Sequence, residues 1–515
     1  MVDRPEPSVE AAGLVPRDAA EAARWLRARL PEGAALQADS RSVRPGDAFF
    51  AFPGLRSDGR RFIAEAIARG AGAIVAERDG GSAVETAAVP TLTLEHLREL
   101  AGPIASAFHD HPSEQMDVVA VTGTNGKTST TQWLARGFEA FGRRGAVVGT
   151  LGSGVPGSLE QTGMTTPDAL GLQARLARFR DDGVDALALE ASSIGLDQGR
   201  LNGTRIAVAA FTNLSRDHLD YHPSMDAYAA AKTRLFGWPG LRSVVVNGDD
   251  AAAQRMLDAV RADADAPRRI VYGLAAGRQG VRGDAILTAE RVVDDGAGLL
   301  MTISGDFGSA DLRLRLVGQF NASNALAVAA CWLALGHDFD RVIGALQSLE
   351  PVPGRMQAIE VPSAPLVVVD YAHSPDALDN VLAALRPVAT RRGGRLWCVF
   401  GAGGERDVGK RPQMGEIAER GADFVVITSD NPRGESPFRI VSDIRAGLTR
   451  EPALTELDRA RAIHAALRTA APSDVVLVAG KGHESYQEIA GVRHPFSDVE
   501  VVRAALAQHG EAAHV

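Results

Sequence analysis

The chain is poor in cysteine, has no excess of basic residues and lacks a long apolar run. Its 515 residues include two cysteines, Cys331 and Cys398, each in an apolar stretch, which favours two core thiols over a disulfide or a metal pair. The formal net charge of −9 and the isolation of its basic pairs argue against a nucleic-acid-binding surface. The longest apolar run, residues 325–335, is too short to cross a membrane. These absences predict a cytoplasmic protein that binds no nucleic acid and inserts into no membrane.

What is present is the composition of an ordinary α/β protein, with 45% hydrophobic residues, 23% charged residues and 54 glycines. A chain of this length is expected to form about three domains. Residues 1–17 contain prolines and acidic residues without an apolar signal-peptide region, so we interpret them as a mobile tail. The oligomeric state does not follow from the sequence, and a monomer is the working expectation.

The chain is organised around residues 118–133, VVAVTGTNGKTSTTQW. A strand-type apolar run leads into a small-residue turn, and a helical apolar pattern follows from Lys127. Glycines let backbone N–H groups approach phosphate oxygens, the lysine can neutralise terminal phosphates, and the Thr128 hydroxyl can bind Mg²⁺. Val121 stands where the strict eight-residue pattern has its first glycine. The succession of strand, loop and helix still predicts nucleotide phosphate binding.

Two further apolar runs in this region, residues 184–189 and 206–211, end in polar residues. The first is followed by Glu190, and the second by TNLSRDHLDYH, which contains His218. Because ligands bind at the carboxyl ends of parallel strands, both residues are candidate Mg²⁺ ligands, with an ordinary solvated loop residue as an equal alternative. Lys232 lies in a helical pattern and, taken alone, is typical of a solvated helix lysine.

The same alternation begins again after residue 350 and predicts a second parallel sheet, with apolar runs at residues 366–369, 396–400, 424–427 and 475–478. We therefore expect an α/β fold with three domains. They are a small N-terminal α/β domain over residues 1–98, a central P-loop-type ATPase domain with a mainly parallel sheet over 99–349, and a C-terminal doubly wound Rossmann-like domain over 350–515. Residues 281–316 partly alternate and are expected to add an antiparallel edge, for which we assign no function.

Read in order, the motifs resemble those of the Mur ligases of peptidoglycan synthesis. They are GTNGKT, TTPD, EASSIGLDQGR, TNLSRDHLDYH, GQFNASN, GRM, DYAHSPD, GERDVGKRP, DNPR and GKGHE, and the resemblance covers residues 39–498. The resemblance implies an ATP-dependent, ADP-forming acid–amino-acid ligase of cytoplasmic cell wall biogenesis, on which cell shape and cell division depend. It also implies an N-terminal domain for the uridine nucleotide, a central domain for ATP and a C-terminal domain for the amino acid.

Within this family, DNPR at residues 430–433 is similar to the motif of the diaminopimelate-adding members. A bidentate guanidinium suits a distal carboxylate and repels an ammonium group, so the physics agrees with the family rule. The resemblance thus implies addition of meso-2,6-diaminopimelate to UDP-N-acetylmuramoyl-L-alanyl-D-glutamate through an acyl phosphate. The alternatives are a lysine-adding member, a folylpolyglutamate or D-Ala-D-Ala-adding ligase, and a nucleotide-binding regulatory protein without catalysis.

The resemblance also assigns residues. The catalytic set is Lys127, Glu190, His218 and Lys232. ATP binding falls to Gly123, Thr124, Asn125, Gly126, Lys127, Thr128, Ser129, Asn321, Arg355, Asp370 and His373. The UDP-linked dipeptide falls to Ser40, Thr165, Thr166, Ser192, Gln198 and Arg200. Diaminopimelate falls to Arg406, Asp430, Asn431, Pro432, Arg433, Gly480 and Glu484. The Mg²⁺ ligands are Thr128, Glu190, His218 and Lys232 as its carbamate.

Lys232 matches the lysine that the family carries as a carbamate. A neutral amine can add CO₂ and become an anionic Mg²⁺ ligand, which requires a lowered pKa. Three positions depart from the family pattern: Ile194 replaces a histidine, residues 55–57 replace a more polar triplet near the uridine site, and Ala402 replaces a cysteine. The first two weaken individual substrate contacts, whereas the third lies in a backbone-dominated loop.

Overall fold

The computed structural model describes residues 18–54, 57–78, 88–262, 265–274, 280–294 and 298–512. The expected N-terminal tail and most of the 55–57 departure lie outside these ranges. The chain divides into two compact units. The first contains Met1–Met116, Thr166–Gly183 and Asp197–Arg205, and the second contains Asp117–Thr165, Val184–Leu196 and Ile206–Val515.

The first unit is built on a four-stranded parallel sheet, in the order β1 (Leu36–Gln37), β2 (Ala48–Ala51), β3 (Ala73–Glu77) and β4 (Thr91–Leu94). Its helices are α1 (Ala19–Arg27), α2 (Ile63–Ala68), α3 (Leu97–Phe108) and α5 (Ala169–Asp181). Successive strand residues point to opposite faces. Phe50 packs in the cluster with α1 and α3, and Phe49 in the cluster with α2. The small α/β unit predicted for the N-terminal region is confirmed.

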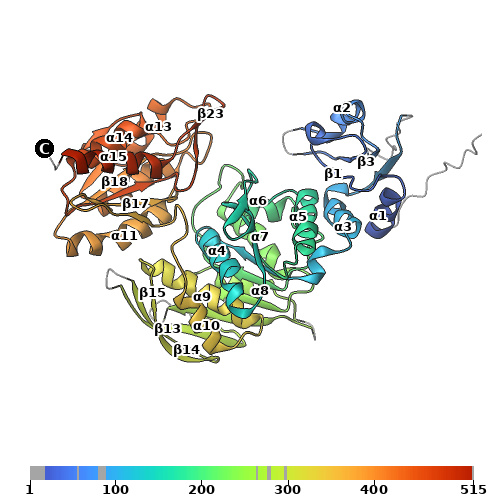
Figure 1. The fold of residues 1–515 in the computed structure, drawn as a ribbon, viewed down its shortest axis with the longest axis horizontal. Helices are drawn as coiled ribbons and strands as arrows, with labels where there is room; N and C mark the ends of the chain where they lie inside the picture. The colour runs from blue at the N-terminus through green and yellow to red at the C-terminus, as the bar shows by residue number, and fades with distance from the viewer. Residues whose placement is uncertain are drawn as a thin grey trace, which may run out of the picture. The chain divides into compact units, whose positions relative to one another are not determined.

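An eleven-stranded sheet forms the first half of the second unit (Figure 1). Its order is β15 (Gly308–Leu314), β14 (Leu299–Gly305), β13 (Ala285–Asp294), β12 (Arg268–Leu274), β11 (Ser243–Asn247), β10 (Val208–Phe211), β5 (Asp117–Thr122), β9 (Ala186–Glu190), β6 (Gly145–Gly149), β7 (Gly152–Val155) and β8 (Ser158–Glu160). The strands from β13 to β6 are parallel, and both edges are antiparallel. The predicted antiparallel edge in residues 281–316 is therefore confirmed.

Helices α4 (Lys127–Gly137), α9 (Gln319–Ala334) and α10 (Phe339–Gln347) share one apolar core with this sheet. Trp133 of α4 and Trp332 of α9 are fully buried there. Helix α9 is apolar all round, as expected for a helix that is covered on every side. Shorter helices are α6 (Ser193–Asp197), α7 (Met225–Thr233) and α8 (Ala253–Asp258).

The second half of this unit is a six-stranded sheet in the order β16 (Gln357–Ile359), β17 (Leu366–Asp370), β21 (Val475–Ala479), β18 (Leu396–Phe400), β19 (Phe424–Ile427) and β20 (Leu454–Thr455), antiparallel only at β16. One core cluster joins it to α11 (Pro375–Arg391), α12 (Lys410–Gly421) and α13 (Pro437–Arg445), and a second joins it to α14 (Arg459–Thr469) and α15 (Asp498–Ala512). Helices thus cover both faces, and the doubly wound prediction is confirmed. A hairpin, β22 (Tyr486–Ile489) and β23 (Val492–Pro495), follows β21.

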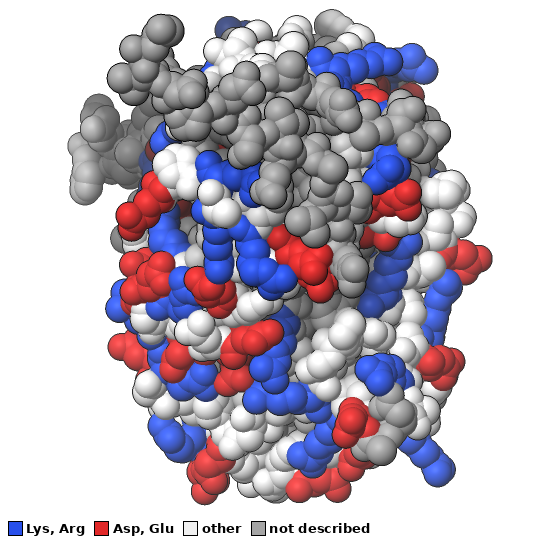
Figure 2. All heavy atoms as spheres, turned by 90° about the vertical axis from the view of Figure 1, so that its right-hand side faces the viewer, with Lys and Arg blue, Asp and Glu red and all other residues white. Residues whose placement is uncertain are grey.

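Other properties expected from the sequence can be checked in the described part of the chain. Both cysteines are buried free thiols, and burial raises the pKa of each. Within the described ranges, every helix is too short or too polar to span a bilayer. On the face shown in Figure 2, basic and acidic side chains alternate over the described surface instead of gathering into a patch of one sign. The boundaries after residues 98 and 349 remain predictions.

Candidate active site

The glycine-rich loop lies where the sequence predicts it, between β5 and α4. Gly126 has φ +84° and directly precedes the helix, and a Cβ added there would lie 2.3 Å from the Asn324 side-chain oxygen. At Gly123 an added Cβ would lie 1.9 Å from the Thr212 hydroxyl. Only glycine fits both positions, so the loop backbone can turn its N–H groups towards an anion at the helix N-terminus.

Two lysines converge on this loop. The Lys127 ammonium donates to the carbonyls of Gly123, at 2.7 Å, and Thr124, at 2.8 Å. Lys232 of α7 donates to the same Gly123 carbonyl at 2.7 Å and lies 4.4 Å from the Tyr228 ring centre. Burial lowers the pKa of Lys127 and, helped by the neighbouring Lys127 charge, brings the pKa of Lys232 well below its usual value.

The reading of Lys232 as a solvated helix lysine is wrong, because its side chain is 1% exposed. Helix α7 lays its Tyr228 and Lys232 against the phosphate loop, where the Tyr228 hydroxyl and the Thr124 hydroxyl are 3.1 Å apart. Burial also raises the pKa of Tyr228, so this phenol stays protonated. The amine of Lys232 is thereby held in the environment that favours its neutral form.

Glu190 ends β9 and is fully buried beside the loop. Its two carboxylate oxygens accept from the backbone N–H of Thr150, at 2.8 Å, and from the Thr150 hydroxyl, at 3.0 Å. A Cβ added at Gly149 would lie 2.3 Å from one of these oxygens. The end of β6 therefore shapes the position of this carboxylate.

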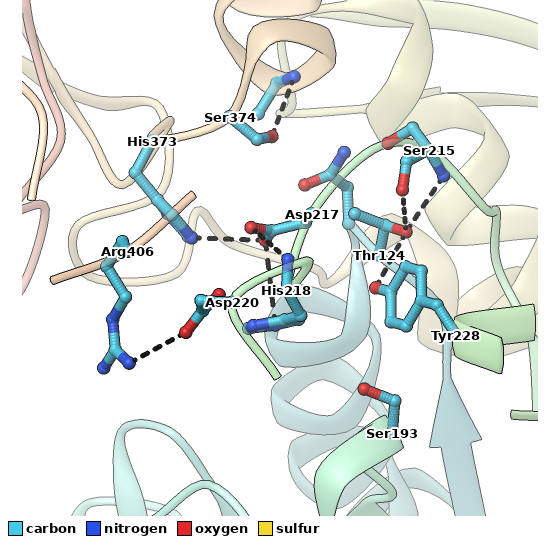
Figure 3. A network of polar contacts seen from close by, with 12 residues as sticks. Thr124, Ser193, Ser215, Asp217, His218, Asp220, Tyr228, His373, Ser374 and Arg406 are labelled. Carbon is cyan, nitrogen blue, oxygen red and sulfur yellow. Dashed lines mark hydrogen bonds and ion pairs between the residues drawn. The ribbon is translucent and has the colours of Figure 1, made fainter. Parts of the chain in front are cut away.

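Asp217 is the centre of a polar network that sequence reasoning noted only in passing (Figure 3). Its carboxylate lies 3.7 Å from His218 Nε2, 3.6 Å from His373 Nε2 and 3.7 Å from Lys410 Nζ. Burial would raise the pKa of Asp217, but these three groups outweigh it and hold that pKa well below its usual value. Burial lowers the pKa of His218 to about 4, against the opposing charge of Asp217, so its imidazole is neutral near pH 7.

Two further ion pairs join the segments that carry Asp217 and Lys410, which are residues 216–220 after β10 and residues 406–410 at the start of α12. The guanidinium of Arg216 contacts Asp407 at 3.0 and 3.1 Å, and that of Arg406 contacts Asp220 at 3.2 Å. Together with the pair between Asp217 and Lys410 they make three ion pairs. Two of the three have their carboxylate in residues 216–220, and the third has its cation there. We refer to these three pairs as the loop ion pairs.

The first turn of α11 and the segment before β16 also reach the phosphate loop. Arg355 donates to the Thr128 hydroxyl at 3.0 Å, and its guanidinium lies 4.5 Å from the Tyr371 ring centre. Asp376 accepts from the Asn125 side chain at 2.7 Å and from the Ser215 hydroxyl at 3.2 Å. Sequence reasoning did not single out Asp376, which is the last residue of the DYAHSPD motif.

Two residues assigned to ATP, Asp370 and Asn321, have local hydrogen-bond partners, and a third, Ser129, is buried. Asp370 accepts from the backbone N–H groups of Met356 and Ala372, both at 2.7 Å, and burial raises its pKa. The Asn321 side chain donates to the Val317 carbonyl at 2.8 Å and accepts from Asn324 at 3.4 Å. Ser129, also assigned to ATP, lies buried in the first turn of α4.

The loops assigned to the amino acid lie together at the carboxyl ends of β19, β18 and β21. The buried Lys481 ammonium donates to Asn431, at 3.0 Å, and to Glu484, at 2.7 Å, while Asn431 donates to Glu484 at 2.8 Å. Arg433 has φ +51° and donates to the Gly404 carbonyl at 2.7 Å. Pro432 lies between Asn431 and Arg433 in the chain.

Two further residues assigned to the amino acid are Asp430 and Gly480. The Asp430 carboxylate lies 2.5 Å from where a Cβ of Gly480 would be, so the residue after β21 must be glycine. Burial would raise the pKa of Asp430, but the charges of Lys481 and Arg459 lower it. Ala402 is buried in the adjoining core, consistent with a small effect of that departure.

The residues assigned to the UDP-linked dipeptide fall in both units. In the first unit, Ser40 donates to Glu65 at 3.1 Å, and Arg200 binds the Gln198 side chain at 2.7 and 3.0 Å and the Thr166 carbonyl at 2.8 Å. In the second unit, the Thr165 and Thr150 hydroxyls are 3.1 Å apart, and Ser192 accepts from the Gly195 N–H at 3.0 Å. Ile194, which departs from the family pattern, is half-buried in α6.

Family models match the chain in three successive stretches. They describe the Mur ligase family catalytic domain over residues 34–109, the Mur ligase middle domain over residues 121–332, and the Mur ligase glutamate ligase domain over residues 354–482. The chain belongs to the Mur ligase family. The resemblance drawn from the motifs is thereby confirmed, and with it ATP-dependent, ADP-forming ligase activity.

Relatives within the Mur ligase family match over nearly the whole chain. The UDP-N-acetylmuramoyl-L-alanyl-D-glutamate–2,6-diaminopimelate ligases of Acidovorax sp. (strain JS42) and Ralstonia nicotianae (strain ATCC BAA-1114 / GMI1000) are each 48% identical. The alignments cover 95% and 94% of this chain and 97% and 95% of those proteins. A solved structure bearing the same enzyme name is 38% identical, with a TM-score of 0.64, and the match covers 92% of this chain and 95% of that one.

Proposed function

We infer that the chain is the Mur ligase that joins meso-2,6-diaminopimelate to UDP-N-acetylmuramoyl-L-alanyl-D-glutamate in peptidoglycan precursor synthesis. The observation that carries this inference is the pairing, in one compact unit, of the phosphate loop with the loop that holds Arg433. The names of the relatives that are 48% identical agree with it. We propose that the reaction takes place in the cytoplasm, because its substrates include free nucleotides.

The first step activates a carboxylate, because joining a carboxylate to an amine is uphill in water. The γ-carboxylate of the D-glutamyl residue attacks the γ-phosphorus of ATP, a new P–O bond forms, and the bond to the β–γ bridging oxygen breaks to release ADP. Such a transfer needs position and charge neutralisation more than covalent help. The Lys127 ammonium and the loop N–H groups supply both, and Arg355 is in reach of the loop through Thr128.

The second step forms the amide. The diaminopimelate amine attacks the acyl carbon, a tetrahedral intermediate forms, phosphate leaves with the C–O bonding electrons, and the nitrogen loses a proton. Arg433 and Asn431 hold the distal carboxylate, and Glu484 accepts from the neighbouring ammonium group. The Lys481 ammonium positions Asn431 and Glu484 by donating a hydrogen bond to each.

The residues near the loop fit Mg²⁺ that is bound largely through phosphate. Among the described residues no cluster of three or more histidine, cysteine or carboxylate side chains forms a metal cage. Mg²⁺ in nucleotide sites uses one or two carboxylates plus substrate phosphates, so a cage is not needed. Glu190, the neutral His218 ring, the Thr128 hydroxyl and a carbamate on Lys232 would hold it, and it would neutralise phosphate charge.

Gly149→Ala tests the placement of Glu190. The added methyl group meets the Glu190 carboxylate at 2.3 Å, so the carboxylate must move and its bonds to Thr150 break. We expect kcat to fall about tenfold to a hundredfold, with a higher Mg²⁺ requirement. Phosphate release at several Mg²⁺ concentrations measures this. The matched control is Gly344→Ala, where an added Cβ meets nothing within 4 Å and kcat should not change. Equal rates in both variants would refute the role of Glu190.

Arg433→Ala tests the specificity of the amino-acid site. Loss of a charge-assisted carboxylate contact should raise the KM for diaminopimelate about tenfold to a hundredfold, and leave the weak use of L-lysine unchanged because lysine has no distal carboxylate. Arg439→Ala, an exposed arginine on α13, is the control. A variant that keeps the full preference for diaminopimelate would remove Arg433 from the site.

The function itself is tested by phosphate release from ATP with UDP-N-acetylmuramoyl-L-alanyl-D-glutamate and either meso-diaminopimelate, L-lysine or no amino acid. Release that depends on diaminopimelate is the expected result. Release with lysine instead would keep the family and overturn the reading of DNPR. No release with either would point to another ligase of the family.

We also propose that the chain acts as a monomer with three functional parts. Residues 1–98 would hold the uridine nucleotide, residues 99–349 ATP, and residues 350–515 the amino acid. The three family models follow the same order along the chain, which supports this division. Sedimentation at working concentration tests the monomer, and a dimer mass would contradict it.

A further inference from the structure

Arg459 and Asp498 form a buried ion pair between the first residues of two helices in the C-terminal part of the chain. Both side chains are 0% exposed. The contact is bidentate, with Nε 2.7 Å from one carboxylate oxygen and Nη2 2.8 Å from the other. Arg459 is the first residue of α14, and Asp498 is the first residue of α15.

Stability does not account for this arrangement. Removing two charges from water costs more than most ion pairs return, and a pair of apolar side chains of similar volume would serve a core as well. A cation in the first turn of α14 also faces the positive end of that helix dipole. The guanidinium must therefore make contacts that an apolar side chain cannot make.

Those contacts are two backbone carbonyls. Arg459 donates through Nη2 to the Ala479 carbonyl at 2.8 Å and through Nη1 to the Ser429 carbonyl at 3.3 Å. Ala479 ends β21, and Ser429 follows β19. These two strands are not neighbours, because β18 lies between them in the sheet. One guanidinium thus ties together two strand ends that the sheet hydrogen bonds do not connect directly.

The tied carbonyls directly precede the two loops that hold the amino acid. Ser429 precedes Asp430, and Ala479 precedes Gly480. Beyond the tie, Asn431 and Glu484 are 2.8 Å apart, and Asp430 packs against Gly480 without room for a Cβ. Since these contacts leave little slack, the spacing of the two strand ends decides whether Arg433 and Glu484 can bind the same molecule.

We propose that Arg459 is a positioning residue that sets the distance between the 430–433 loop and the 480–484 loop, and so the affinity for the amino acid. It does not touch substrate, because its side chain is enclosed on all sides. The proposal rests on the proposed placement of diaminopimelate on these loops. It predicts that the KM for the amino acid is sensitive to Arg459, while the KM values for ATP and the UDP-linked dipeptide are not.

The test compares the wild type with the double variant Arg459→Met, Asp498→Leu, which keeps volume and leaves no unpaired charge. We expect the KM for diaminopimelate to rise about tenfold or more, and the other two KM values to stay within about twofold. Arg459→Lys is the second variant. The lysine ammonium has its three N–H donors on one nitrogen, so it cannot occupy the separate Nη1 and Nη2 positions from which Arg459 reaches the two carbonyls, and the amino-acid KM should rise here too.

A purely structural role predicts a different pattern, with less folded protein and unchanged KM values. Arg143→Met provides that comparison. Arg143 pairs with Asp117 and Asp185 at the amino ends of β5 and β9 in the eleven-stranded sheet, whereas the amino-acid loops belong to the six-stranded sheet. If Arg433→Ala raises the amino-acid KM and both Arg459 variants leave it unchanged, the positioning role is refuted while the site stands. If none of the three raises it, the site assignment fails and the proposal fails with it.

Discussion

Replacing Lys127 by alanine is expected to reduce phosphate release about a thousandfold or more. Its ammonium lies against the phosphate loop, where it donates to the Gly123 and Thr124 carbonyls at 2.7 and 2.8 Å. Removing one preorganised charge contact to a transferring phosphoryl group costs about a hundredfold to a hundred-thousandfold in comparable sites. The assay is phosphate release with all three substrates present at saturation.

The same variant should keep its fold. Lys232 still donates to the Gly123 carbonyl, and burial already disfavours the Lys127 charge, so the melting temperature should change by only a few degrees. Binding of the UDP-linked dipeptide, measured by calorimetry, is the control that the protein is intact. Turnover equal to the wild type would exclude Lys127 from the reaction.

Lys232→Ala is expected to lose about a hundredfold or more in kcat and to regain part of it when acetate or propionate is added. We propose that in the wild type the neutral amine attacks CO₂, an N–C bond forms, and one N–H proton leaves to solvent, giving a carbamate. Burial and the Lys127 charge favour the neutral amine that this step needs. A small free carboxylate can enter the space left by the side chain and supply the missing anion.

Lys127→Ala treated with the same acids is the matched control, because a lost cation cannot be replaced by an anion. A ¹³C carbamate signal after incubation of the wild type with labelled bicarbonate gives a second readout that does not need turnover, and the signal should be absent in Lys232→Ala. No rescue together with no carbamate signal would leave Lys232 as an ordinary buried amine.

The fold was largely predictable because its signals are local. The runs around residues 48–52 and 73–76 form β2 and β3, and the loop before Lys127 carries its own strand, turn and helix pattern. The same patterns predicted that Glu190 ends a strand and that His218 lies in the loop after the next strand along the chain, and both positions are found at β9 and after β10. These features depend on residues within a few positions of each other.

The remaining parts of the site depend on contacts between distant segments. Lys232 gives no signal in an alanine-rich helix, and it is buried only because α7 packs on the phosphate loop. Asp217 and Lys410 are far apart in sequence. Asp217 follows a strand of the eleven-stranded sheet and Lys410 begins a helix that packs on the six-stranded sheet, so their contact depends on how the two sheets are arranged. Lys410 belongs to the GERDVGKRP motif, but no local sequence pattern predicts which carboxylate its ammonium contacts.

The loop ion pairs also make the two halves of the second unit complementary in charge. Arg216 meets an aspartate, whereas Asp217 and Asp220 meet cations, so exchanging any one loop for a uniformly acidic or basic one sets like charges opposite each other. Chimaeras that take their C-terminal half from another family member should therefore work when residues 216–220 travel with residues 406–410. The two loops should therefore be exchanged together, although nearly two hundred positions of sequence separate them.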